Sequence, residues 1–127
     1  MASGVRMFLG LEAVLWLPYG VLCFFVPSVL ADGAAVVASS PTAATEIRAM
    51  YGGLQAAIGV ACVLGARSPE RAPEVLRMLL ILALGLGATR LVGAVMDGSF
   101  TSYTIMALVF EFVTVAGAAV MLRRAEA

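Results

Sequence analysis

Four apolar segments, each about twenty residues long, make up most of the 127-residue chain. They cover about residues 7–30, 45–65, 74–96 and 101–122, and short polar joints separate them. An apolar helix of roughly 20 residues spans the hydrocarbon core of a bilayer while satisfying its own backbone hydrogen bonds. The sequence therefore predicts an all-α fold, an integral membrane four-helix bundle, with residues 1–127 forming a single transmembrane domain.

Composition narrows the classes of function. Hydrophobic residues make up 62% of the chain and charged residues 13%, far from soluble usage. The formal net charge is zero and lysine is absent, so no basic surface for nucleic acid is expected. Histidine, the commonest metal ligand and the usual near-neutral acid or base, is also absent. We therefore predict no metal, no cofactor and no nucleic-acid partner.

The distribution of arginine predicts the topology. Basic residues precede the first segment, surround the middle joint and follow the last segment, whereas the first and third joints have none. Short loops rich in arginine and lysine stay on the cytoplasmic side of a membrane. Both termini and the middle joint are therefore predicted to be cytoplasmic (N-in/C-in). The residues of this pattern are Arg6, Arg67, Arg71, Arg77, Arg123 and Arg124.

Two opposite charges interrupt the last two segments. Arg90 lies late in the third segment and Glu111 lies near the middle of the fourth. A charge near the bilayer centre costs roughly 3 kcal/mol, so such residues usually face the protein interior and have a partner. Counted from the joint between the segments, the two residues differ in depth by about one helical turn. We predict that they pair across an antiparallel helix contact.

Further polar residues lie near the predicted outer side. Arg48, Tyr51 and Gln55 share one helical face, while Glu46 points nearly opposite to Arg48. Structural roles remain open for Glu46, Arg48 and Tyr103, because charged pairs can lock helices in register and tyrosines can anchor at the interface. We interpret Glu46 as a structural or pairing residue. The candidate ligand-binding residues are Arg48, Tyr51, Gln55, Arg90, Tyr103 and Glu111.

Glu12 is the remaining acid within a segment, and two interpretations of it stay open. The inward-facing candidates comprise three acids and two arginines, so one acid lacks a basic partner. A buried unpaired carboxyl tends to take up a proton, which makes Glu12 the proton-linked candidate. Alternatively its side chain reaches the cytoplasmic interface, about 9 Å along the helix from Arg6.

Small residues recur in the second and third segments. Glycine and alanine let helix backbones approach closely in membranes. We expect these positions to mark helix contacts, within the chain or with another protein. They are Gly52, Gly53, Ala56 and Gly59 in the second segment and Gly85, Gly87 and Gly93 in the third.

Short motifs across most of the chain are similar to those of a known family. They are the run from Glu46 to Leu54 (EIRAMYGGL), Thr89-Arg90, Asp97-Gly98 and Glu111. In these motifs the chain resembles a family of small, uncharacterised four-span bacterial membrane proteins, filed as a domain of unknown function and similar to DoxX-like bundles. The resemblance implies a four-span fold and a multi-pass location in the bacterial inner (cytoplasmic) membrane. It implies no established activity and no catalytic residue.

A second resemblance is weaker. Small multidrug transporters also have four short spans and a glutamate early in the first span, as Glu12 is here. That resemblance would imply proton-coupled transport. The chain departs from these transporters because its arginine bias is one-sided, whereas their dual-topology members have little bias, and because their aromatic and glycine pattern is not present.

The working hypothesis is a charged pocket that opens to the outer side, bounded by the second, third and fourth segments. Arg48 and Arg90 would bind the anionic or carbonyl-bearing head of a small amphiphilic molecule, which is bound or transported. In the enzyme alternative, Glu111 is the acid or base and Arg90 stabilises charge on a lipophilic substrate. In a third alternative the chain is an accessory subunit. Membrane lipids, a homo-oligomer or a larger membrane complex are the partners compatible with these hypotheses.

Overall fold

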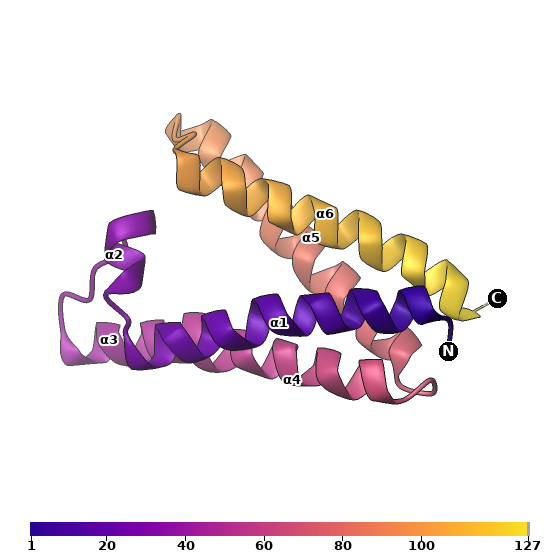
Figure 1. Ribbon diagram of the computed structural model, residues 1–127. Helices are drawn as coiled ribbons and strands as arrows, with labels where there is room; N and C mark the ends of the chain where they lie inside the picture. The colour runs from indigo at the N-terminus through magenta and orange to yellow at the C-terminus, as the bar shows by residue number, and fades with distance from the viewer. Residues whose placement is uncertain (127) are drawn as a thin grey trace. The chain divides into compact units, whose positions relative to one another are not determined.

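The computed structural model describes residues 1–126, and all regular secondary structure in that range is helical. Four helices are long and apolar enough to cross a membrane: α1, the continuous run Pro41–Arg67, α5 and α6. The predicted all-α class with four spans is therefore confirmed (Figure 1). The elements are α1 (Ser3–Phe25), α2 (Val29–Ala34), α3 (Pro41–Ile47), η1 (Arg48–Gly53), α4 (Leu54–Arg67), α5 (Ala72–Asp97) and α6 (Ser102–Glu126).

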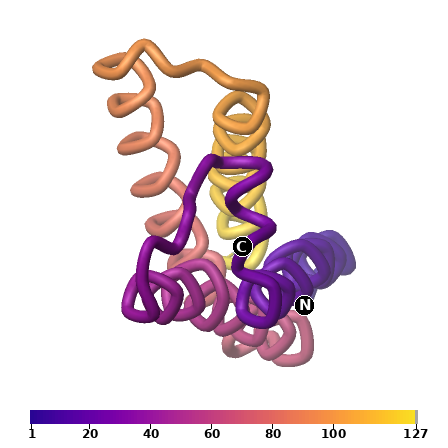
Figure 2. The backbone as a smooth tube through the Cα atoms, turned by 90° about the vertical axis from the view of Figure 1, so that its left-hand side faces the viewer, coloured from indigo at the N-terminus to yellow at the C-terminus, as the bar shows by residue number. Residues whose placement is uncertain are grey.

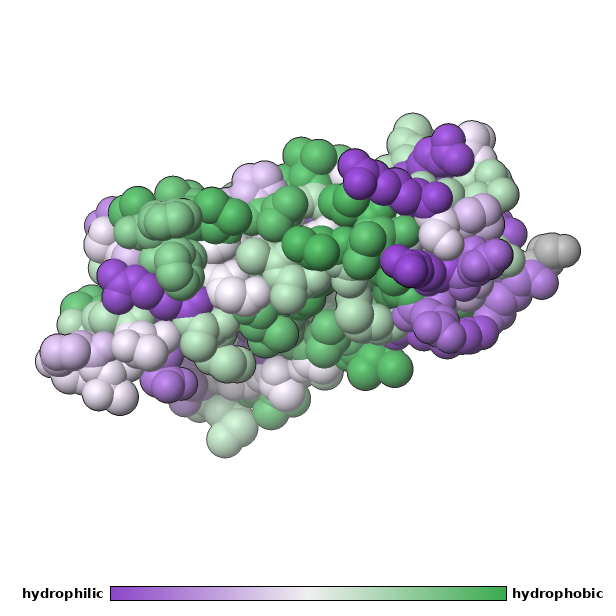
Figure 3. Space-filling view, turned by 90° about the horizontal axis from the view of Figure 1, so that it is seen from below, coloured by the Kyte–Doolittle hydropathy of each residue, from purple (hydrophilic) through white to green (hydrophobic). Residues whose placement is uncertain are grey.

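The exterior of the spans suits a lipid environment. Large apolar side chains such as Phe25 and Ile81 are 73% and 70% exposed. In the space-filling view, hydrophobic residues are exposed over much of the visible face (Figure 3). Contiguous apolar exposure of this kind marks a surface that water does not cover. The chain is a multi-pass helical membrane protein.

The first helix is shorter at its C-terminal end than the predicted segment 7–30. It ends at Phe25, and residues 29–34 form the separate helix α2. The physical reason is Pro27, which has no N–H to donate to the carbonyl of Cys23. Instead the chain turns, and the N–H of Val29 bonds to the carbonyl oxygen of Val26 at 3.1 Å.

The second membrane helix begins earlier than predicted, at Pro41 rather than near residue 45. Ser40 is its N-cap, and the side-chain oxygen of Ser40 accepts a hydrogen bond from the N–H of Ala43 at 3.1 Å. Proline is favoured at the first helical position because its missing N–H has no intrahelical partner there. Ser40 and Pro41 lie in the predicted joint before residue 45, and the structure shows that the helix starts there.

A π-helix interrupts this second span. In η1 the N–H of Leu54 bonds to the carbonyl oxygen of Ala49, five residues back, rather than to the fourth. π turns within α-helices are rare and frequently lie at functional sites. Because the turn is wider here, the helical spacing that placed Arg48, Tyr51 and Gln55 on one face does not carry through the segment.

The chain divides into two compact units, which we describe separately. Unit 1 comprises Met1–Leu9 and the chain from Gly65 onward, and unit 2 comprises Gly10–Leu64. In unit 1, α5 and α6 form an antiparallel hairpin (Figures 1 and 2). The beginning of α1 belongs to this unit, where Val5 and Leu9 are fully buried. A Cβ atom on Gly117 of α6 would lie 2.4 Å from the Phe8 ring, so a larger residue at this contact would require the ring to move.

In unit 2, α1 packs closely against the second span. A Cβ atom on Gly20 would lie 2.4 Å from the backbone nitrogen of Ala56, and one on Gly59 would lie 2.5 Å from the Cβ of Leu17. One on Gly52 would lie 2.9 Å from the Cβ of Phe24. The expected close approach at Gly52 and Gly59 is confirmed. Near the C-terminal end of α1 the unit buries a cluster of Cys23, Leu30 and Ile47. The side chains packed against this cluster are Tyr19, Val29, Val36 and Tyr51.

The glycines of α5 behave differently from the expectation. Only Gly87 approaches α6 closely, because its added Cβ would lie 3.3 Å from the Cβ of Glu111. An added Cβ on Gly85 or Gly93 would meet no atom of the described chain within 4 Å. These two positions therefore make no close helix contact within residues 1–126, and a contact with another protein stays a prediction for them.

The topology remains a prediction with a direct test. Both chain termini lie at one end of unit 1, as an even number of spans requires (Figure 1). We expect a reporter fused after Ala127 to be cytoplasmic and one inserted between Ala34 and Pro41 to be external, because only the joints on the terminal side carry arginine. Paired alkaline phosphatase and fluorescent protein fusions measure both positions. An externally active reporter at Ala127 would contradict the assignment.

Candidate functional site

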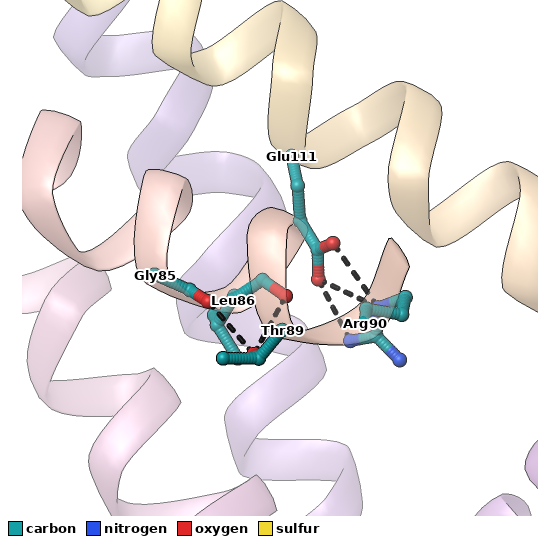
Figure 4. A network of polar contacts seen from close by, with 5 residues as sticks. All are labelled: Gly85, Leu86, Thr89, Arg90 and Glu111. Atoms are coloured by element: carbon teal, nitrogen blue, oxygen red, sulfur yellow. Dashed lines mark hydrogen bonds and ion pairs between the residues drawn. The ribbon is translucent and has the colours of Figure 1, made fainter. Parts of the chain in front are cut away.

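Arg90 and Glu111 form a bidentate ion pair between α5 and α6. The Nε of Arg90 donates to both carboxylate oxygens of Glu111, at 2.9 and 3.1 Å, and Nη2 donates to Oε1 at 2.7 Å. Glu111 is 3% exposed, whereas the Arg90 side chain is 28% exposed. Figure 4 shows the two side chains meeting between the helices. The predicted pair is confirmed, and its fork geometry is the strong form of such a contact.

Gly87 and Thr114 lie one helical turn from Arg90 and Glu111 respectively. Gly87 precedes Arg90 by three positions, and its lack of a side chain lets α6 approach at Glu111. Thr114 follows Glu111 by three positions and is fully buried. Thr89 lies beside Arg90 in sequence, yet its hydroxyl donates within α5, to the carbonyls of Gly85 and Leu86 (Figure 4). Thr89 is therefore not part of the site.

Tyr103 supports the arginine from the first turn of α6. The centre of its ring lies 6.0 Å from the Cζ of Arg90, and its side chain is half-buried. At this distance a guanidinium is at the outer limit of an attractive interaction with an aromatic face. The arrangement places Tyr103 next to Arg90, as the candidate site requires.

An open hollow of about 200 Å³ lies beside Arg90 at the joint between α5 and α6. The ends of the two helices shape it. Gly98 adopts the left-handed conformation (φ 61°), and the N–H of Ser99 bonds back to the carbonyl of Ala94 at 3.0 Å, which ends α5. Thr101 then caps α6, because its hydroxyl accepts from the N–H of Thr104 at 3.2 Å. The lining residues are Arg90, Gly93, Ala94, Asp97, Ser99 and Thr104.

Some polar groups around the hollow already form interactions within the protein, and others do not. Arg90 is held by Glu111, and the backbone N–H of Thr104 is held by Thr101. Within residues 1–126, no ion pair or side-chain hydrogen bond engages the carboxylate of exposed Asp97. Nε and Nη2 of Arg90 and the N–H of Thr104 are therefore engaged within the protein, whereas the exposed carboxylate of Asp97 is not.

The other candidate binding residues lie in unit 2, where they support its packing. The Nε of Arg48 donates to the backbone carbonyl of Phe24 at 3.0 Å, in the last turn of α1. A basic side chain at this place satisfies a carbonyl that the ending helix leaves without its usual partner. Tyr51 packs on the buried cluster, and Gln55 is half-buried. Glu46 is exposed, and the pairing expected of it has no counterpart within residues 1–126.

Glu12 is buried at 3% exposure in unit 2, where its carboxylate accepts a hydrogen bond from Trp16. The Nε1 of Trp16 and the Oε2 of Glu12 are 2.8 Å apart, one helical turn along α1. The interpretation in which Glu12 extends toward Arg6 at the interface therefore does not match its position. The proton-linked role of Glu12 stays a prediction.

The structure brings Arg90, Tyr103 and Glu111 together and places Arg48, Tyr51 and Gln55 in the other unit. The hollow is lined by α5, α6 and their joint, whereas the expected pocket also involved the second span. Sequence reasoning did not assign Gly93, Ala94 or Ser99 to a site. Asp97-Gly98 was recognised as a motif of the family, and a short motif alone does not indicate a hollow.

Four apolar spans and a buried ion pair define the class: a small multi-pass helical membrane protein. The chain belongs to the family described as Domain of unknown function (DUF4345), whose pattern matches residues 4–122. No curated protein and no solved structure matches the chain. The family resemblance expected from the sequence motifs is therefore confirmed, and the role of the site must be argued from its own chemistry.

Proposed function

We propose that the protein binds a small amphiphilic molecule in the hollow beside Arg90. The observation that carries the proposal is the combination of an open hollow of about 200 Å³ with charged and hydroxyl-bearing side chains, at the end of two lipid-exposed helices. Binding sites typically combine apolar walls with a few placed polar groups. In the predicted topology the hollow opens to the outer side of a bacterial inner membrane.

The ion pair gives one side of this site a fixed geometry. Glu111 holds Arg90 through three hydrogen bonds, so the guanidinium has a defined position before any ligand arrives. Preorganised polar groups lose little entropy on binding. An anionic head would compete with Glu111 for the same donors, which disfavours the anionic head group considered from sequence.

Binding is favoured over acid–base catalysis by the same contacts. Both oxygens of Glu111 accept hydrogen bonds from Arg90, and the residue is almost fully buried. A general base must reach the proton that it removes. Glu111 would have to break the ion pair first, whereas a bound head group can use the hollow as it stands.

Gly93 offers a test that separates ligand binding from folding. It lines the hollow, and an added Cβ meets no described atom within 4 Å, so Gly93→Leu should fill the space without a clash. Gly85→Leu is the matched control, because Gly85 lies two turns earlier on α5, is equally open and does not line the hollow. We expect native mass spectrometry of gently solubilised protein to detect a small molecule on wild type and Gly85→Leu, and its loss from Gly93→Leu.

Two results would contradict the proposal. One is wild-type protein that retains no small molecule from the membrane. The other is Gly93→Leu protein that retains the same molecule in the same proportion as Gly85→Leu. Equal helical content of the two variants, measured by circular dichroism, shows that folding does not cause the difference.

A further inference from the structure

We infer that the head group bound in the hollow is a protonated amine, so that the ligand class is lipophilic amines. This inference rests on the proposed function and names the chemistry that the site selects. It depends on which polar atoms around the hollow are already engaged within the protein and which remain for a ligand.

Donors that could bind an anion are already engaged on both helices. Glu111 takes Nε and Nη2 of Arg90, and Thr101 takes the backbone N–H of Thr104. An anion that reached Arg90 would have to displace a carboxylate that is 3% exposed. Removing one partner from a buried ion pair carries a large penalty, which the new contact would have to offset.

The polar groups that remain can accept hydrogen bonds. Asp97 presents a carboxylate that no described residue engages, and Ser99 presents a hydroxyl on the same hollow, whereas the hydroxyl of Thr104 shares a hydrogen bond with that of Thr101 at 3.1 Å. The charges of Arg90 and Glu111 cancel. The residues that line the hollow, counted together with Glu111, therefore have a formal net charge of −1, which is that of Asp97. An ammonium group carries several N–H donors and the opposite charge, and charge-assisted hydrogen bonds are the strong ones.

The geometry also accommodates the rest of such a molecule. Asp97 follows Arg90 by seven residues, two turns along one face of α5, so the carboxylate lies about 10 Å from the ion pair along the helix. Gly93 and Ala94 form the small-residue floor between them. Exposed Met96, in the last turn of α5, and exposed Phe100, in the joint, provide apolar surface for a tail. Asp97 thus anchors the head while the tail remains in lipid.

The test compares three probes with one alkyl chain and different charge: decylamine, decanamide and decanoate. Equilibrium dialysis measures their binding to the full-length protein in phosphatidylcholine nanodiscs, with empty nanodiscs subtracted. We expect decylamine to bind about tenfold more tightly than decanoate. Asp97→Asn should weaken decylamine about tenfold and change decanamide less than about twofold. Asp97→Glu, which keeps the charge, should retain tight decylamine binding.

Asp32→Asn is the matched control, because it removes the same charge from the exposed helix α2 in the other unit. If decanamide or decanoate binds as tightly as decylamine, or if Asp97→Asn and Asp32→Asn bind decylamine alike, the amine inference fails while the proposed site stands. If no probe binds, or if Gly93→Leu binds every probe as wild type does, the proposed function fails and the inference fails with it.

Discussion

Replacing Glu111 with leucine is expected to lower the free energy of unfolding by about 3–5 kcal/mol, because it leaves the Arg90 guanidinium without its partner between two membrane helices. Arg90→Met should cost a similar amount for the converse reason. The double variant should lose clearly less than the sum of the two, since neither charge then remains unpaired. Titration with sodium dodecyl sulfate in mixed micelles, followed by circular dichroism, measures the unfolding equilibrium of all four proteins.

The chain contains its own control for this cycle. Arg77 and Glu126 form an ion pair between the same two helices, but their side chains are 53% and 46% exposed. Exposed pairs contribute below about 1 kcal/mol, because water screens the charges and side-chain entropy opposes the contact. We expect Arg77→Met and Glu126→Leu to show small losses and weak coupling. Equal coupling in the two cycles would show that burial at Glu111 does not strengthen the pair.

Gly20→Ala and Gly10→Ala are expected to shift stability in opposite directions, although both change the same helix. A methyl group on Gly20 would lie 2.4 Å from a backbone atom of the second span, and backbone cannot move aside as a side chain can. We expect a loss near the upper end of the range for overpacking, about 3 kcal/mol. A methyl group on Gly10 meets no described atom within 4 Å, so the helix propensity of alanine should stabilise by up to about 1 kcal/mol.

Unit 2 carries convenient reporters for this comparison. Trp16 is the single tryptophan and is 5% exposed, while Cys23 and Cys62 are free thiols with no exposed surface. Gly20→Ala should speed the reaction of both cysteines with a membrane-permeant thiol reagent and lower the detergent midpoint of the Trp16 emission change. If Gly20→Ala and Gly10→Ala react at the same rate, α1 does not pack at Gly20 as the structure describes.

Helix ends show where local chemistry suffices and where it does not. Thr101 caps α6 at the predicted bound, because its hydroxyl acts on the nearest backbone N–H groups, whereas Pro41 begins its helix four residues before the predicted bound. The end of α1 was placed five residues too late, because hydrophobicity continues through residue 30 although the backbone turns at Pro27. The π-helix at Arg48–Gly53 was not anticipated, because the sequence pattern there is that of an ordinary apolar helix.

The glycines also show which contacts the sequence predicts and which it does not. Gly52, Gly59 and Gly87 lie at close helix contacts, whereas Gly85 and Gly93 face open space. All five lie in mainly apolar segments of the sequence. Which face of a helix meets a neighbour depends on the rotation of that helix about its axis, and an almost uniformly apolar segment carries little information about rotation. The same ambiguity hid Gly20, the glycine with the closest backbone approach in unit 2.

The amino-acid sequence by itself determined the helical class, the four spans and the pairing of Arg90 with Glu111. These follow from hydrophobic length and from the cost of an unpaired charge in lipid, both of which are properties of residues and their depth. Only the tertiary structure decided that Arg48 caps α1, that three hydrogen bonds fix the Arg90 guanidinium, and that Asp97 lines the hollow. Those facts depend on which atoms meet across helices, and a pattern of apolar residues does not specify that.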